Sequence, residues 1–266
     1  MRKYIILASL LLSGLALYAQ DYSRLDSLMD VYTNAMRPEA NDLKTAEVDF
    51  MISAAQDSLT RQHIALYLFD YYRESPLMGE EAVAVHIYDE WFAGGKVAMR
   101  GEIEEMDAKL FADFNRSSII GNQAPELRLR KPCNGTLTLP RQGRTTMLWF
   151  FDTSCSKCRL EAQVLPEILR QEASLPVDFC AVYCGRDKKE WKAFRKSFKV
   201  NSPNVKVIHA WDPEIDSDYL RLYGVISTPK IYMIDSRGVI IGRRLEPDSF
   251  PQIFELAGKI ENIYRN

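Results

Sequence analysis

Apolar residues recur at helical spacing through the N-terminal part of the chain. From Asp21 to about Ser118, hydrophobic positions lie three or four residues apart with polar residues between them, as in helices that bury one face. Ser75-Pro76 and Gly94-Gly95 interrupt this pattern as helix breakers. The pattern predicts about five helices in an all-α module. Their apolar positions run over Leu25–Tyr32, Val48–Ala55, Ile64–Tyr72, Met78–Phe92 and Ile103–Phe114.

The pattern changes near Ile119, where helical periodicity stops and Gly and Pro residues appear together. Two short alternating segments follow, around Leu129 and Leu137, and an Asn134-Gly135 turn separates them. This arrangement predicts a β-hairpin, with Cys133 exposed beside its turn. We place a domain boundary at the change of pattern.

Apolar runs then alternate with helical patterns to the C-terminus. Thr145–Phe151 is apolar at nearly every position, as in a strand covered on both faces. The alternation predicts a mostly parallel sheet that ends in an antiparallel hairpin across Asp235–Gly238. Strands are expected at Thr145–Phe151, Val177–Tyr183, Val205–Ala210, Lys230–Ile234 and Val239–Arg243. Helices are expected at Arg159–Glu172, Lys188–Phe198, Asp216–Tyr223 and Ser249–Tyr264. The expected fold class is therefore α/β, a central mixed sheet flanked by helices, after an N-terminal all-α helical domain.

The first residues have the layout of a secretory signal peptide. Arg2 and Lys3 precede an almost wholly apolar run, Tyr4–Tyr18, which is shorter than the roughly 20 residues of a membrane-spanning helix. We predict cleavage after Ala19 and export to the periplasm. The predicted segments are 1–19 (signal peptide), 20–118 (helical domain) and 119–266. No cysteine lies near the cleavage point, so no lipid anchor is expected.

Charge and cysteine content narrow the function classes. The net charge of −2 lacks the basic bias of proteins that bind nucleic acids. Export allows disulfides to persist. The five cysteines are too few for a disulfide-stapled scaffold, and their odd number leaves at least one thiol unpaired within a monomer.

Two cysteines stand where the strand Thr145–Phe151 gives way to a helix. Cys155 and Cys158 are two residues apart, which puts the first thiol at the helix N-terminus and the second one turn on. Backbone N–H groups and the helix dipole favour a thiolate there, and the thiolate is the reactive form. We predict that Cys155 and Cys158 form a redox-active disulfide. The alternatives are an inert structural disulfide and a metal site. Zinc would need two more ligands, so no metal is expected. No cofactor is expected either.

Two charged residues flank the first cysteine. Lys157 is expected to stabilise the Cys155 thiolate by its positive charge, or else to be a solvated lysine at a helix start. Asp152 is expected either to handle the proton of Cys158 or to be a turn residue that accepts backbone N–H bonds.

Two longer stretches carry a family resemblance. Trp149–Cys158 and Tyr223–Asp235, which contains Ser227-Thr228-Pro229, resemble the thioredoxin superfamily, and most closely its exported TlpA/ResA-like thiol-disulfide oxidoreductases. Gly121–Pro125 is similar to the Gly-x-x-Ala-Pro start of that group. The resemblance covers residues 119–266 and implies a thioredoxin-like domain there. The helical part resembles, more distantly, helical extensions found before such domains.

The resemblance also implies roles for single residues. Cys155 attacks a substrate disulfide and Cys158 resolves the mixed disulfide. Pro229 is cis and faces the cysteine pair, and Thr228 presents its backbone to the substrate. Exported members usually keep cysteines of other proteins reduced, with electrons from a membrane-bound partner.

The chain departs from the family pattern at the cysteine pair. Ser154 stands where a tryptophan commonly precedes the first cysteine, and Trp149 occupies the position of thioredoxin's buried aspartate. These departures leave reduction, oxidation and isomerisation open. A non-enzymatic partner-binding module on a thioredoxin-like scaffold is one alternative. A peroxiredoxin-like peroxidase is another, but Thr153 is one residue out of place for it and the matching proline is missing.

Two further features outside the pair carry open interpretations. Cys184, at the end of the strand Val177–Tyr183, is either a third thiol near the pair or a small buried hydrophobe. The lysines and arginines of the helix Lys188–Phe198 form either a docking patch for an acidic partner or a solvated face.

Overall fold

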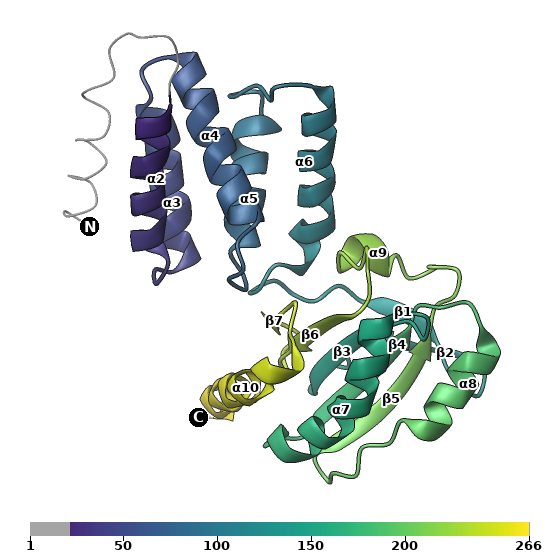
Figure 1. The fold of residues 1–266 in the computed structure, drawn as a ribbon. Coiled ribbons are helices and arrows are strands. Elements are labelled where there is room, and N and C mark those ends of the chain that lie inside the picture. The colour runs from purple at the N-terminus through teal and green to yellow at the C-terminus, as the bar shows by residue number, and fades with distance from the viewer. Residues whose placement is uncertain (1–21, 266) are drawn as a thin grey trace. The chain divides into compact units, whose positions relative to one another are not determined.

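A computed structural model describes residues 22–265, so the predicted signal peptide lies outside the described residues. The described chain divides into two compact units, one up to Ala112 and one from Asp113 onward (Figure 1). The division falls a few residues before the boundary expected near Ile119. Among residues 22–265, no helix is both long and apolar enough to cross a membrane.

The first unit is all helical. Its apolar faces meet in one core, which includes Met29, Ile52 and Leu68. The helix predicted from Met78 starts later, at Glu81, and its last turn is a π-helix, Tyr88–Phe92. The α-helices are α2 (Ser23–Met36), α3 (Asn41–Ala54), α4 (Ser58–Arg73), α5 (Glu81–Ile87) and α6 (Glu102–Asn115).

The second unit is built on one seven-stranded sheet in the order β2-β1-β5-β4-β3-β6-β7. The strands are β1 (Leu127–Arg130), β2 (Thr136–Leu139), β3 (Thr145–Phe151), β4 (Val177–Tyr183), β5 (Val205–Trp211), β6 (Lys230–Ile234) and β7 (Ile240–Gly242). The helices are α7 (Ser156–Glu172), α8 (Lys188–Ser197), α9 (Tyr219–Leu222) and α10 (Phe250–Arg265). This confirms a mixed sheet flanked by helices.

The parallel part of the sheet is smaller than predicted. Only β3, β4 and β5 pair in parallel, whereas β6 is antiparallel to β3 and β1 is antiparallel to both β2 and β5. The expectation of a mostly parallel sheet was therefore wrong. Apolar runs show that strands are buried, but they do not distinguish the direction of their neighbours.

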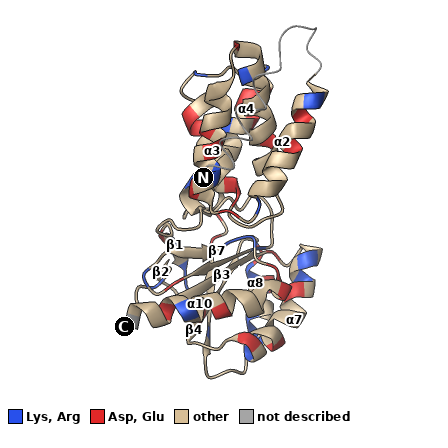
Figure 2. Ribbon diagram, turned by 90° about the vertical axis from the view of Figure 1, so that its left-hand side faces the viewer, with Lys and Arg blue, Asp and Glu red and all other residues tan. Residues whose placement is uncertain are grey.

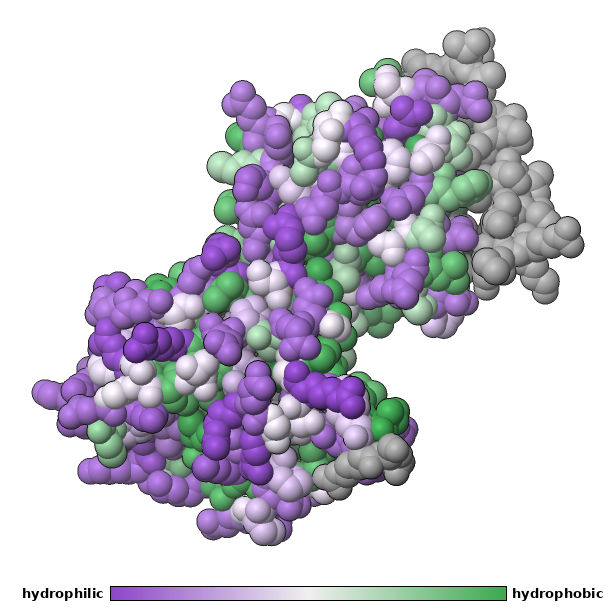
Figure 3. Space-filling model, turned by 180° about the vertical axis from the view of Figure 1, so that it is seen from behind, coloured by the Kyte–Doolittle hydropathy of each residue, from purple (hydrophilic) through white to green (hydrophobic). Residues whose placement is uncertain are grey.

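Alternate side chains of the central strands enter two separate cores. Met147, Trp149 and Phe151 of β3 pack with α7, α8 and α10, while Leu148 and Phe150 pack on the opposite face, where α9 lies. In Figure 1, α7 crosses in front of the strands. Charged residues are frequent on the helices and sparse in the central strands (Figure 2). Hydrophilic side chains cover much of the face in Figure 3.

The helix predicted from Asp216 to Tyr223 was too long. The carboxylate of Asp212 accepts the backbone N–H groups of Asp216 and Ser217, and Asp218 has a left-handed φ of 57°. These turn contacts compete with helix formation, so α9 is confined to Tyr219–Leu222.

Candidate active site

The cysteine pair lies at the junction of β3 and α7. Cys155 has an extended backbone and caps α7, and its Sγ accepts the backbone N–H of Cys158 at 3.2 Å. Cys158 is buried in the first turn, while Cys155 is half-buried. All five cysteines are free thiols in this structure. The junction thus presents one thiol to solvent and holds the second behind it.

The start of β6 brings a second segment to Cys155. Because β6 is antiparallel to β3, with Lys230 opposite Phe150, the residues before Lys230 lie beside the end of β3. The Sγ of Cys155 is 3.3 Å from the carbonyl oxygen of Thr228 and donates a hydrogen bond to it. The Thr228–Pro229 bond is cis. Cys155, Thr228 and Pro229, far apart in the sequence, therefore form one site.

The two thiols have opposite pKa shifts. Partial burial raises the pKa of Cys155, but hydrogen bonds from the Cys158 side chain and backbone outweigh it, so the pKa of Cys155 is below its ordinary value. Burial, together with the hydrogen bond to Cys155, raises the pKa of Cys158 to about 12. As pH rises, the half-buried thiol of Cys155 therefore ionises before the buried thiol of Cys158.

This difference predicts selective alkylation. With iodoacetamide at pH 7, we expect Cys155 to react fastest, the exposed Cys133 more slowly, and Cys158 more than about a hundredfold slower than Cys155, because rate follows thiolate fraction and access. Peptide mass spectrometry over a time course measures the three rates. If Cys133 reacts faster than Cys155, helix α7 does not activate the thiol.

The direct side-chain contacts of Lys157 and Asp152 are with Glu246 and Ser154, and the charge of the Cys155 sulfur also acts on Lys157. The Lys157 ammonium lies 2.6 Å from the Glu246 carboxylate, and it is the backbone N–H of Lys157 that helps to lower the pKa of Cys155. One carboxylate oxygen of Asp152 accepts both the backbone N–H and the hydroxyl of Ser154, each at 2.8 Å. These contacts fit the turn interpretation of Asp152. Its proton-handling role and the thiolate role of Lys157 stay predictions.

A buried acid that the sequence reasoning missed lies on α7. Glu161 is 4% exposed and follows Cys158 by one helical turn on the same buried face. Its carboxylate accepts a hydrogen bond from the indole N–H of Trp149 at 2.8 Å. Burial raises the pKa of Glu161 to about 7, although Trp149 and Lys157 lower it in part. The helical spacing from Cys158 was the available signal, but the partner on β3 was not visible from the sequence.

A third thiol lies near the pair. The backbone N–H of Cys184 donates to the carbonyl of Phe151 at the end of β3, at 2.8 Å. Burial raises the pKa of Cys184 to about 12, and the nearby carboxylate of Asp152, together with the Cys158 sulfur when it is ionised, adds to the increase. Cys184 is therefore a protonated neighbour of the pair, and both of its sequence interpretations retain support.

Within residues 22–265, no cluster of three or more His, Cys, Asp or Glu side chains is arranged to hold a metal ion. The described histidines His63 and His86 of the helical unit contact the carboxylates of Asp26 and Asp49.

The chain was compared with curated proteins, solved structures and protein families. No curated protein matches the chain. A thioredoxin-like protein from Bacteroides caccae has a similar structure, with a TM-score of 0.65 and 14% identity, over 90% of this chain and 86% of that one. A domain of a possible thiol-disulfide isomerase from Cytophaga hutchinsonii is 23% identical over 55% of this chain and 97% of its own, with a TM-score of 0.47.

The Bacteroides caccae protein supports the thioredoxin-like fold, and the matched share extends into the N-terminal helices. In the search against protein families, residues 119–256 match Redoxin, which is just over half of the chain and contains the cysteine pair and Pro229. The chain thus belongs to the Redoxin family, in a thioredoxin-like domain that follows a helical one.

Proposed function

We propose that the protein is an exported thiol-disulfide oxidoreductase that reduces disulfides of other proteins. The observation that carries the proposal is the pairing of an ionisable thiol, Cys155, at a helix N-terminus with a buried, protonated thiol, Cys158, one turn behind it. The apolar N-terminal segment supports export, and the near-neutral charge gives no reason to expect nucleic acid as a partner.

The first step uses the Cys155 thiolate. Its sulfur attacks one sulfur of the substrate disulfide, a mixed disulfide forms, and the other substrate sulfur leaves as a thiolate. The carbonyl of Thr228 lies next to the reacting sulfur, and in our proposal the backbone of Thr228 contacts the backbone of the bound substrate chain. Ile226 and Leu160 are exposed apolar side chains on the flanking elements and offer contact surface to a protein substrate.

The second step uses Cys158. Its thiol loses a proton and attacks Cys155, the Cys155–Cys158 disulfide forms, and the second substrate thiol is released reduced. Glu161 lies one helical turn after Cys158 on the same buried face of α7, and its pKa is about 7. In our proposal its carboxylate takes the Cys158 proton. Two electrons from a donor, which we propose to be a membrane-bound partner, then restore the dithiol.

The test is reduction of insulin by dithiothreitol in the presence of the purified chain. We expect the wild-type chain to accelerate insulin precipitation. Reduced Cys158→Ser, mixed with insulin after dithiothreitol is removed, is expected to accumulate a mixed disulfide between Cys155 and insulin, because the resolving thiol is gone. Non-reducing electrophoresis and mass spectrometry identify that adduct. Absence of both acceleration and adduct would exclude the proposed activity.

A further inference from the structure

The inner strand β5 has an open edge. On one side it pairs with β4 along its whole length, from Val205 to Trp211. On the other side its ladder with β1 contains a single residue pair, Arg130 with Trp211. Among the described residues, no strand pairs with β5 on this side before Trp211. Unpaired backbone N–H and C=O groups of a strand are a template for another strand.

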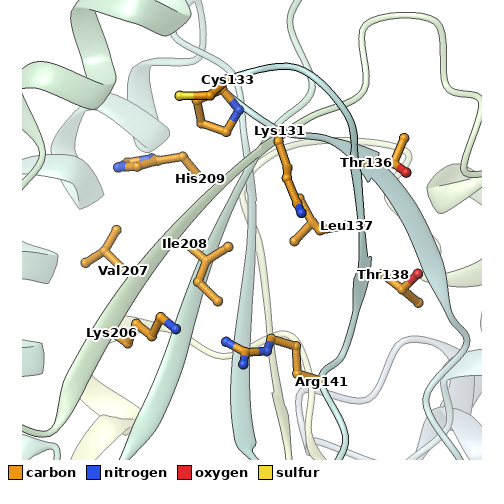
Figure 4. A pocket seen from close by; sticks show the side chains of 11 residues that line it. Lys131, Cys133, Thr136, Leu137, Thr138, Arg141, Lys206, Val207, Ile208 and His209 are labelled. Atoms are coloured by element: carbon orange, nitrogen blue, oxygen red, sulfur yellow. The ribbon is translucent and has the colours of Figure 1, made fainter.

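A groove follows this open edge. It has a volume of about 820 Å³, with β5 residues 206–209 on one side and the β1–β2 hairpin on the other. Figure 4 shows Lys206 and Ile208 on the β5 side, with Lys131, Leu137 and Arg141 across the groove from them. A strand rises about 3.3 Å per residue, so the open part of β5 matches an occupant of about four to six residues.

The groove is positively charged. Lys131, Arg141 and Lys206 direct their cationic groups into the space between the two walls (Figure 4). No Asp or Glu is among the described residues that line it. Arg141 also contacts the buried Asp178 at 3.2 Å, which fixes its position and offsets part of its charge. The two lysines leave a net positive groove.

The floor between these charges is apolar. Ile208 and Leu137 are half-buried side chains that face each other across the groove in Figure 4. An extended peptide points successive side chains to opposite sides, so alternate residues meet the floor and the others face the rim. Only a polypeptide backbone matches the free N–H and C=O groups of β5 as well.

We propose that this groove binds an extended acidic segment of another protein, which adds to the open edge of β5 as a further strand. Backbone hydrogen bonds to β5 supply the affinity, and Lys131 and Lys206 select acidic residues. The site is distinct from the cysteine pair. Lys206 on β5 pairs with Asp178 on β4, and Asp178 pairs with Thr146 near the start of β3. Cys155 follows the other end of β3, so the groove and the cysteine pair lie toward opposite ends of the sheet. A docked partner therefore leaves Cys155 accessible.

The test measures fluorescence anisotropy of labelled peptides with the purified full chain. The probe is a decapeptide of alternating Glu and Val, compared with the same peptide N-methylated at alternate residues and with alternating Lys and Val. We expect saturable binding of the acidic peptide only, with at least about tenfold weaker binding after N-methylation, because methylation removes the strand hydrogen bonds. Equal binding of the N-methylated peptide, or no saturable binding of the acidic one, would overturn the proposal.

Matched charge reversals localise the binding. Lys206→Glu is expected to raise the Kd of the acidic peptide about tenfold. Lys189→Glu makes the same charge reversal at an exposed position on α8, next to Glu190, whose carboxylate contacts Thr153 near the cysteine pair. This variant should keep the Kd of the acidic peptide within about twofold of the wild-type value. An equal loss of affinity in both variants would mean that the peptide binds elsewhere.

Hydrogen exchange of the wild-type chain is a second measurement, and it needs no substitution. The bound peptide should protect the backbone amides of β5 from exchange. Protection confined to other elements would contradict the proposal. The peptides contain no cysteine, so the result is independent of thiol-disulfide exchange.

Discussion

Cys155→Ser is expected to lower the rate of insulin reduction by at least about a thousandfold, to the level of dithiothreitol alone. The Sγ of Cys155 is the sulfur at the helix N-terminus, where the Cys158 N–H donates to it at 3.2 Å. A serine hydroxyl at the same place neither ionises near neutral pH nor forms a disulfide. Cys158 does not take over the attack, because burial shields it and keeps its thiol protonated.

The matched control for this loss is Cys133→Ser. Cys133 is an exposed thiol on the β1–β2 turn, outside the cysteine pair, so its replacement is expected to keep the reduction rate within about twofold of the wild type. Initial rates of insulin precipitation measure both variants. Activity that survives Cys155→Ser but falls with Cys133→Ser would transfer the attacking role to the hairpin.

The sequence predicts the central strands closely, because their burial is encoded locally. The apolar runs Thr145–Phe151, Val177–Tyr183 and Lys230–Ile234 have the same bounds as β3, β4 and β6. Such runs are apolar at nearly every position, which a strand covered on both faces requires. The cysteine pair also follows from local pattern, since the strand-to-helix change fixes which thiol caps the helix.

Features that depend on contacts between distant segments are not predictable in this way. Helix α9 is short because the Asp212 side chain occupies the backbone groups before it. The open edge of β5 depends on where β1 stops pairing with it. The partnership of Glu161 with Trp149 depends on which face of β3 meets α7. Trp149 stands where thioredoxin has a buried aspartate on this strand, but a buried acid is still present, because Glu161 contacts Trp149 from α7.

Glu161→Gln is expected to slow the second step of the reaction about a hundredfold at pH 8, because general acid–base groups contribute on that order. Glutamine has nearly the same shape and still accepts the Trp149 N–H, but it cannot take a proton from Cys158. Rapid-quench measurement of mixed-disulfide decay isolates this step. The wild-type rate should rise with pH through an inflection near 7, the pKa of Glu161, and the variant should lack that inflection.

Glu161→Gln is also expected to change how the free energy of unfolding depends on pH. This dependence shows whether Glu161 titrates or only packs in the core. Burial raises the pKa of Glu161 from 4.5 to about 7, so the folded chain retains a proton that the unfolded chain releases between these values. The contribution of Glu161 to the free energy of unfolding therefore falls as pH rises from about 4.5 to 7 and is constant above that. Gln does not titrate, so the variant should match the wild type at pH 4 and exceed it by on the order of 3 kcal/mol at pH 8.

Urea unfolding of both chains across this pH range measures the difference. A stability difference that does not change with pH would mean that Glu161 has the same pKa in the folded and the unfolded chain. A slower second step in Glu161→Gln would then need another cause.

Trp149→Phe is the matching control on β3. It removes the indole N–H that lowers the pKa of Glu161, so the kinetic inflection should move to higher pH while the carboxylate remains. An unchanged inflection in Trp149→Phe would assign the titration to a different group.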